Sequence, residues 1–96
     1  MEWRTLTFSS LYEISEDGQL RNNKTGKILI PYNDGRYLRV SLLVNKKPKT
    51  FFVHKLVAQH YLDLQSNKLV VDHKDNNKLN NHYSNLQYIT QRLNVS

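Results

Sequence analysis

Residues 37–53 read YLRVSLLVNKKPKTFFV and carry the clearest secondary-structure pattern in the chain. From residue 38 to residue 44 every second side chain is apolar, as in a strand that buries one face. The predicted buried face holds Leu38, Val40, Leu42 and Val44, and the opposite face presents Tyr37, Arg39 and Ser41. Residues 45–48, NKKP, have turn composition, so residues 49–53 are expected to return as an antiparallel partner strand.

Shorter strands precede this hairpin, and turn residues separate them. We predict strands over residues 11–15, 19–21 and 27–30, with turns at the sequences EDG, NNKTG and NDG. Strands this short, joined by tight turns, pair with their neighbours along the chain. The first half of the chain is therefore expected to form an antiparallel β-sheet with one buried face.

The apolar pattern changes after the hairpin. Apolar residues recur at intervals of three and four, which predicts an amphipathic helix over residues 54–62. Short strands at 69–72 and 86–89 flank an asparagine-rich loop, and Thr90 is a suitable N-cap for a final helix. The predicted fold class is α+β, with an N-terminal antiparallel β-sheet followed by a helix and a C-terminal strand, loop, strand and helix.

Length and composition exclude several classes of protein. Ninety-six residues suffice for a single compact domain over residues 1–96. The chain has no cysteine, which excludes a disulfide framework, a thiolate nucleophile and cysteine-based zinc sites. It has neither a signal-peptide pattern nor an apolar stretch of about 20 residues, so we expect no membrane partner and a cytoplasmic location.

The balance of charge favours an anionic partner. Fourteen Lys and Arg against eight Asp and Glu give a formal net charge of +6, which attracts polyanions such as nucleic acid. Residues 36–55 hold basic side chains interleaved with aromatic ones and no acidic residue, although a solvated sheet edge would have the same composition. The candidate DNA-binding residues are Arg36, Tyr37, Arg39, Ser41, Lys46, Lys47 and Lys49.

Four residues near the C-terminus could act together in catalysis: Asp72, His73, Asn85 and Asn94. A strand, a loop, a strand and a helix can fold back so that Asp72 and Asn94 offer oxygen atoms to one Mg²⁺ or Mn²⁺ ion. His73 would lie beside the cation as a general base, and Asn85 could accept a hydrogen bond from its other ring nitrogen. The alternative is that these residues only pack, cap and turn the chain. Packing, edge hydrogen bonds or a loop position explain the other histidines, His54, His60 and His82.

Residues 70–81, VVDHKDNNKLNN, followed by NLQYIT at 85–90 and Asn94, resemble the catalytic motif of HNH endonucleases of the ββα-metal (His-Me finger) class. The resemblance implies metal binding by Asp72 and Asn94, a general base at His73 and an orienting role for Asn85. It also implies one divalent cation per monomer, Mg²⁺ or alternatively Mn²⁺, and hydrolysis of a DNA phosphodiester to a 5′ phosphate and a 3′ hydroxyl. The third signature position, often His in this family, is Asn94 here, which keeps an oxygen donor.

Upstream segments are similar to the N-terminal module of phage- and intron-associated HNH homing endonucleases: EWR at 2–4, YEIS at 12–15, Gly18, LR at 20–21, and VHKLVA at 53–58. The resemblance divides the chain into a DNA-contacting β part, residues 1–52, and a helix with the HNH motif, residues 53–96. It implies an enzyme that nicks double-stranded DNA as a monomer, or alternatively as a dimer, in a bacterial or phage-infected host cell. Two alternatives stay open: a non-catalytic or decayed HNH-derived DNA-binding module, and an RNA-binding sheet with exposed aromatic residues.

Overall fold

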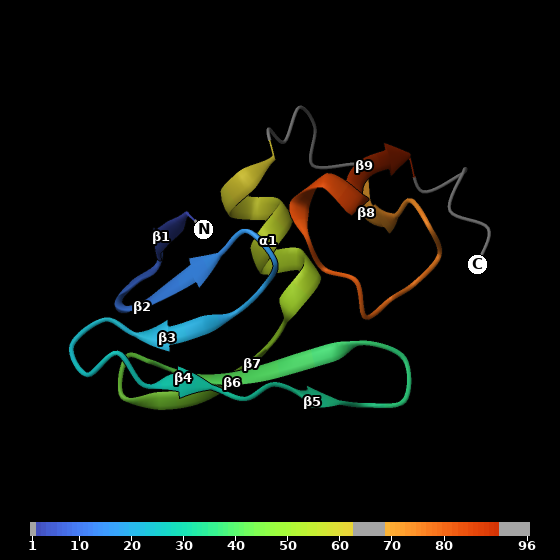
Figure 1. Cartoon of the computed structure of the whole chain (residues 1–96). Coiled ribbons are helices and arrows are strands. Elements are labelled where there is room, and N and C mark those ends of the chain that lie inside the picture. Colours follow the sequence, from blue (N-terminus) through green and yellow to red (C-terminus); the bar gives the residue numbers. More distant parts are fainter. Residues whose placement is uncertain (1, 63–68, 91–96) are drawn as a thin grey trace.

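The computed structural model describes residues 2–62 and 69–90, which form three antiparallel sheets and one α-helix (Figure 1). The first sheet comprises β1 (Trp3–Leu6), β2 (Ser9–Ser15), β3 (Leu20–Asn22) and β4 (Ile28–Leu29). The second comprises β5 (Tyr32–Asn33), β6 (Leu38–Val44) and β7 (Lys47–Phe52). The helix α1 (Val53–Tyr61) follows the second sheet. The third sheet pairs β8 (Leu69–His73) with β9 (Leu86–Thr90), and the 3₁₀ turn η1 (Tyr83–Asn85) lies immediately before β9. The α+β class predicted from the sequence is confirmed.

The N-terminal strands form two sheets, which corrects the single sheet predicted from the sequence. Pro31 lies between β4 and β5 and has no N–H to donate to a continuous strand ladder. Each of these two strands is only two residues long. The sequence pattern also misses β1, because WRTL shows no alternation of buried and exposed side chains that would mark a strand.

The hairpin of β6 and β7 confirms the pattern in residues 37–53. Asn45 and Lys46 both have positive φ, 53° and 66°, as a two-residue turn between twisted strands requires. Val40 and Leu42 are buried on one face of β6, while Ser41 between them is exposed. The period-two alternation therefore predicts both the strand and the direction of its side chains.

The helix α1 connects the two halves of the molecule. Figure 1 shows α1 between the N-terminal strands and the hairpin of β8 and β9. Its Leu56 and Val57 are buried together with Ile14 and Leu20 of the first sheet and Leu86 of β9. Burial of each such side chain contributes about 1.5–3 kcal/mol. One core therefore positions the N-terminal strands relative to the C-terminal hairpin.

The strands β8 and β9 confirm the two strands predicted near the C-terminus. In their register Asp72 lies opposite Gln87, and His73 lies opposite Leu86. The predicted final helix, with Asn94 in it, falls outside the described residues. The ordering of the described elements thus agrees with the prediction as far as β9.

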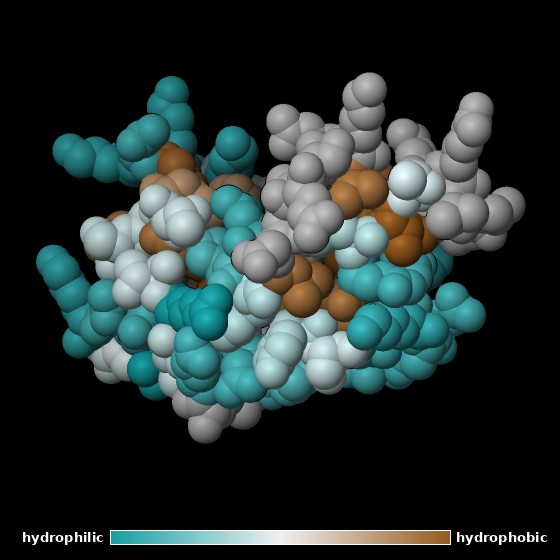
Figure 2. Space-filling model, turned by 90° about the horizontal axis from the view of Figure 1, so that it is seen from above, coloured by the Kyte–Doolittle hydropathy of each residue, from teal (hydrophilic) through white to brown (hydrophobic). Residues whose placement is uncertain are grey.

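Hydrophilic residues cover most of the described surface in Figure 2, and apolar residues form separate patches between them. Of the side chains that the structure describes, the most exposed large apolar one is that of Ile30, at 90%. Among residues 2–62 and 69–90, no helix is long and apolar enough to span a membrane.

Candidate functional site

His73 lies at the end of β8, where its imidazole contacts groups from three other parts of the chain. Its ring centroid is 5.1 Å from that of His54 and 6.3 Å from that of Tyr37. Its Nε2 atom lies 2.9 Å from Oδ1 of Asn81. Only 5% of the residue is exposed, so the imidazole predicted to act as a general base is buried in this structure. Ring contacts and a hydrogen bond compensate for the loss of hydration.

The side chain of Asn85 holds the loop after β8 rather than the imidazole of His73. Its Nδ2 donates to Oδ1 of Asp75 at 2.8 Å and to the carbonyl oxygen of Asn80 at 2.9 Å. Its Oδ1 accepts from the N–H of Asp75 at 3.3 Å. Both amide donors and the amide oxygen are thus engaged within the loop, and Asn81 makes the contact with His73 that we predicted for Asn85.

Asp72 provides a candidate ligand for a cation. The residue is half-buried on β8, and its Oδ2 accepts a hydrogen bond of 2.9 Å from Nε2 of Gln87 across the hairpin. A carboxylate oriented by a neutral amide remains a hard oxygen donor, which fits Mg²⁺ or Mn²⁺. Within the part of the chain that the structure describes, no three His, Cys, Asp or Glu side chains gather as a metal site. The described residues therefore supply one of the two predicted ligands, and Asn94 lies outside them.

A second histidine is buried beside His73. His54 is the second residue of α1, only 5% exposed, and its Nδ1 is buried without a hydrogen-bond partner among the described residues. Burial, followed by the electrostatic influence of His73 and Lys55, lowers the pKa of His54 to about 4. His54 is therefore neutral at pH 7. The sequence predicts a packing role at this position, and it gives no local signal of the contact with His73.

Arg39, a predicted DNA-binding residue, is half-buried and already has partners. Its Nε donates to Oδ2 of Asp34 at 2.5 Å, and its guanidinium lies 4.4 Å from the centre of the Phe52 ring. The N–H groups of Tyr37 and Arg36 lower the pKa of the Asp34 carboxyl to about 2. Residues 36–55 contain no acidic side chain, but the fold brings Asp34, which lies just before this range, into contact with Arg39.

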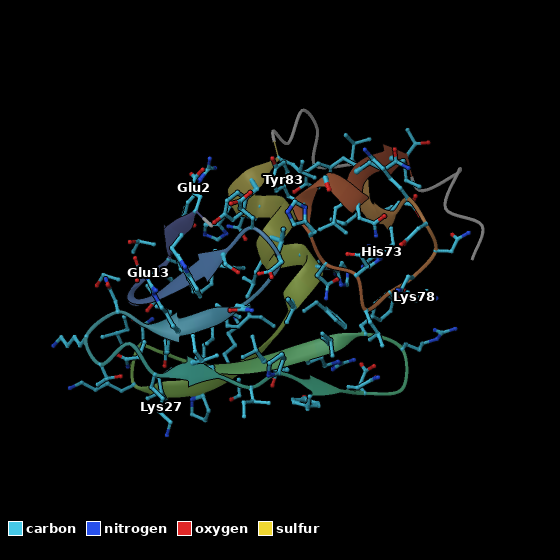
Figure 3. The ribbon with its side chains drawn as sticks, in the orientation of Figure 1. Glu2, Glu13, Lys27, His73, Lys78 and Tyr83 are labelled. Carbon is cyan, nitrogen blue, oxygen red and sulfur yellow. The ribbon has the colours of Figure 1, made fainter. Side chains whose placement is uncertain are left out.

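Tyr37 connects the candidate DNA-binding surface to His73. Its ring is 4.9 Å from that of His54, and Nζ of Lys78 lies 5.3 Å from its centre. Figure 3 shows His73 and Lys78 on the same side of α1, near the loop that follows β8. The other candidates on β6, β7 and their flanking turns are exposed: Arg36, Ser41, Lys46, Lys47 and Lys49.

Comparison with known proteins identifies the family. A family model described as HNH endonuclease matches residues 51–95, and the NUMOD4 motif matches residues 1–42. The DNA endonuclease I-HmuI of Bacillus phage SP01 is 44% identical over 99% of this chain and 56% of its own length. The chain belongs to the HNH endonuclease family. The H-N-H endonuclease F-TflI of Escherichia phage T5 is 31% identical over 83% of this chain and 43% of its own length.

A solved structure agrees with this assignment to the HNH endonuclease family. The structure of the HNH homing endonuclease I-HmuI, reported for DNA binding and cleavage, matches with a TM-score of 0.90 and 41% identity. The match covers 99% of the present chain and 56% of the I-HmuI chain in the solved structure. The present chain thus spans about half the length of these relatives. The segment that matches the HNH model contains Asp72, His73, Asn85 and Asn94.

Proposed function

We propose that this chain is the nuclease part of a metal-dependent DNA endonuclease of the HNH homing type. It would hydrolyse one phosphodiester at a time, leaving a nick with a 5′ phosphate and a 3′ hydroxyl. The observation that carries the proposal is the position of Asp72 and His73 at the end of β8, inside the segment that matches the HNH endonuclease model. Residues 53–96 would perform the chemistry, and residues 1–52 would contact DNA.

In this proposal Asp72 and Asn94 hold one divalent cation, Mg²⁺ or alternatively Mn²⁺. The oriented carboxylate of Asp72 supports this assignment, because carboxylate and amide oxygens are the donors that such ions prefer. When bound, the cation would stabilise negative charge on the phosphate and on the leaving 3′ oxygen.

His73 would accept the proton of the attacking water. Its imidazole is held by rings on two sides and by Asn81, so little rotational freedom would be lost when the reaction begins. Asn85 would act through the backbone, because its hydrogen bonds fix the loop that connects β8 to η1.

The exposed basic residues on β7 and in its flanking turn would bind the DNA backbone. Lys46, Lys47 and Lys49 lie on one hairpin without an acidic neighbour in sequence, and contacts of this kind position a duplex without reading its sequence. Arg39 lies over the ring of Phe52, and Phe52 contacts Tyr37, whose ring lies beside His73, so Arg39 would join the hairpin to the catalytic centre. We propose a monomer on double-stranded DNA, in a bacterial or phage-infected cytoplasm.

Plasmid relaxation tests this function. Purified protein is incubated with supercoiled DNA in Mg²⁺ or Mn²⁺ and compared with His73→Ala and with His82→Asn. His82 is a half-buried histidine that caps η1, and asparagine is a good cap at that position. We expect nicking by the wild type and by His82→Asn, and none by His73→Ala. Equal nicking by all three proteins would remove His73 from the chemistry.

The burial of His73 favours a second candidate, a non-catalytic DNA-binding module, because only 5% of the residue is open to water. This candidate predicts DNA binding that weakens steeply with salt but no cleavage with any divalent cation. Measuring binding and nicking on the same preparation separates the two functions.

A further inference from the structure

We propose that Asn81 is a positioning residue that fixes the tautomer of His73, and that the turn between β2 and β3 holds Asn81 in place. The inference rests on the proposed nuclease function for its catalytic consequence. It assigns a role in the HNH site to a side chain outside the four signature residues and to a turn of the N-terminal part.

The hydrogen bond between Asn81 and His73 defines which ring nitrogen carries the proton. Oδ1 of Asn81 lies 2.9 Å from Nε2 of His73, and both side chains are buried. A carbonyl oxygen can only accept a hydrogen bond, so Nε2 must donate. The neutral imidazole then has its lone pair on Nδ1, which becomes the nitrogen able to accept a proton from water.

Burial makes this hydrogen bond a strong constraint on the ring. Asn81 is 3% exposed, so water competes little for its amide oxygen. If the ring turned over, Cε1 would take the place of Nε2, and if the proton moved to Nδ1, Oδ1 would face a nitrogen without a proton. In both cases a buried acceptor would lose its donor. The ring contacts with Tyr37 and His54 limit the same rotation from the other faces. The amide and the two rings together therefore select one orientation of His73.

Gly18 brings the N-terminal part against Asn81. Gly18 has φ of +89°, and a Cβ added there would lie 2.7 Å from Cγ1 of Val53 and 3.3 Å from Cβ of Asn81. The turn can approach α1 and the loop this closely only because the residue has no side chain. In the same region the carbonyl oxygen of Glu16 accepts a hydrogen bond of 2.9 Å from the N–H of Tyr83. The turn between β2 and β3 thus contacts residues on both sides of His82.

The first test measures the tautomer directly. Long-range ¹H–¹⁵N spectra of protein labelled with ¹⁵N-histidine distinguish the two neutral tautomers, and comparison with His73→Ala assigns the peaks. We expect His73 to carry its proton on Nε2 in the wild type and in Asn81→Asp, which keeps an acceptor oxygen. In Asn81→Leu we expect a mixture of tautomers. A wild-type His73 protonated on Nδ1 would overturn the proposal, even if Asn81→Leu failed to fold.

The second test measures nicking, with Asn23→Leu as a matched control. Asn23 is an exposed asparagine in the turn before β4, far in sequence from the site. We expect Asn81→Leu to lower kcat about 10- to 100-fold with little change in KM for DNA, Asn81→Asp to recover part of the rate, and Asn23→Leu to match the wild type. Unchanged kcat in Asn81→Leu would refute the positioning role. A wild type with the expected tautomer but no nicking would instead refute the nuclease function.

Discussion

The buried, neutral imidazole of His54 should make the stability of this protein depend on pH in a predictable way. His54 has an ordinary pKa of 6.5 when exposed and a pKa of about 4 in the folded protein. Below pH 6.5 the unfolded chain binds a proton at this residue that the folded chain does not bind, so protonation favours unfolding. The contribution of His54 to stability is therefore fully present above pH 6.5 and is lost as pH falls toward 4.

The size of the effect follows from the two pKa values. Each pH unit over which only the unfolded state holds the proton costs about 1.4 kcal/mol. At pH 4.5 the loss relative to pH 7 is therefore about 2–3 kcal/mol from this single residue. That is a substantial part of the roughly 5–15 kcal/mol that stabilises a typical domain. The groups that face His54 are Tyr37, Phe52 and His73, with Lys55 beside it in α1, and none is a carboxylate that could compensate the new charge.

The measurement is urea denaturation of the wild type and of His54→Phe at pH 7 and pH 4.5. Phenylalanine keeps the ring contacts and cannot titrate, and any packing cost of the larger ring is the same at both pH values. The variant should lose about 2–3 kcal/mol less stability than the wild type between pH 7 and pH 4.5. The half-buried His82, replaced by Asn, serves as the control and should follow the wild type. Parallel losses in wild type and His54→Phe would refute a buried neutral imidazole at this position.

Three further predictions concern other features of the structure. In urea denaturation, Gly18→Ala should destabilise the fold by about 1–3 kcal/mol more than Gly26→Ala. Both glycines have positive φ, but of the two only Gly18 has atoms within 4 Å of an added Cβ. Asp34→Asn keeps the acceptor for the turn N–H groups but removes the charge opposite Arg39. DNA binding should therefore tighten, and the logarithm of the binding constant should fall more steeply with the logarithm of the salt concentration, by about 0.9 for each phosphate contact that Arg39 gains. An unchanged slope would contradict this. Asn85→Ala removes three hydrogen bonds from the loop after β8. Limited proteolysis should therefore cut that loop several-fold faster in the variant than in the wild type. Equal rates of cutting would show that other contacts hold the loop.

The sequence predicts local structure well where one residue pattern dictates it. Period-two alternation and the turn residues Asn45 and Lys46 are sufficient for the β6–β7 hairpin, because both act through neighbouring residues. The division of the N-terminal strands into two sheets depends instead on a missing N–H at Pro31 and on pairing between short strands. Such pairing is decided by the whole fold, and no local pattern specifies it.

The sequence names candidate site residues but does not predict what surrounds them. Asp72 and His73 are candidates because they lie where a predicted strand ends in a polar loop and where the sequence resembles the HNH motif. Asn81 is one of several asparagines in that loop, and nothing in the sequence distinguishes the one whose amide reaches the imidazole. His54 lies 19 positions before His73 in sequence, and only the packing of α1 brings the two rings together. The contacts between distant elements therefore explain most of what the sequence left out.

The contacts of His73 also bear on how the two parts of the chain depend on each other. The NUMOD4 motif contributes Tyr37, whose ring stacks on the imidazole, and Gly18, which packs against Asn81. The HNH segment contributes His54 and Asn81 itself. Each side of the imidazole is thus bounded by a different part, so neither matched segment alone encloses it. If one part only delivered the other to DNA, a flexible connection between them would suffice. The observed environment of His73 instead combines residues from both matched segments, which pack against each other around it.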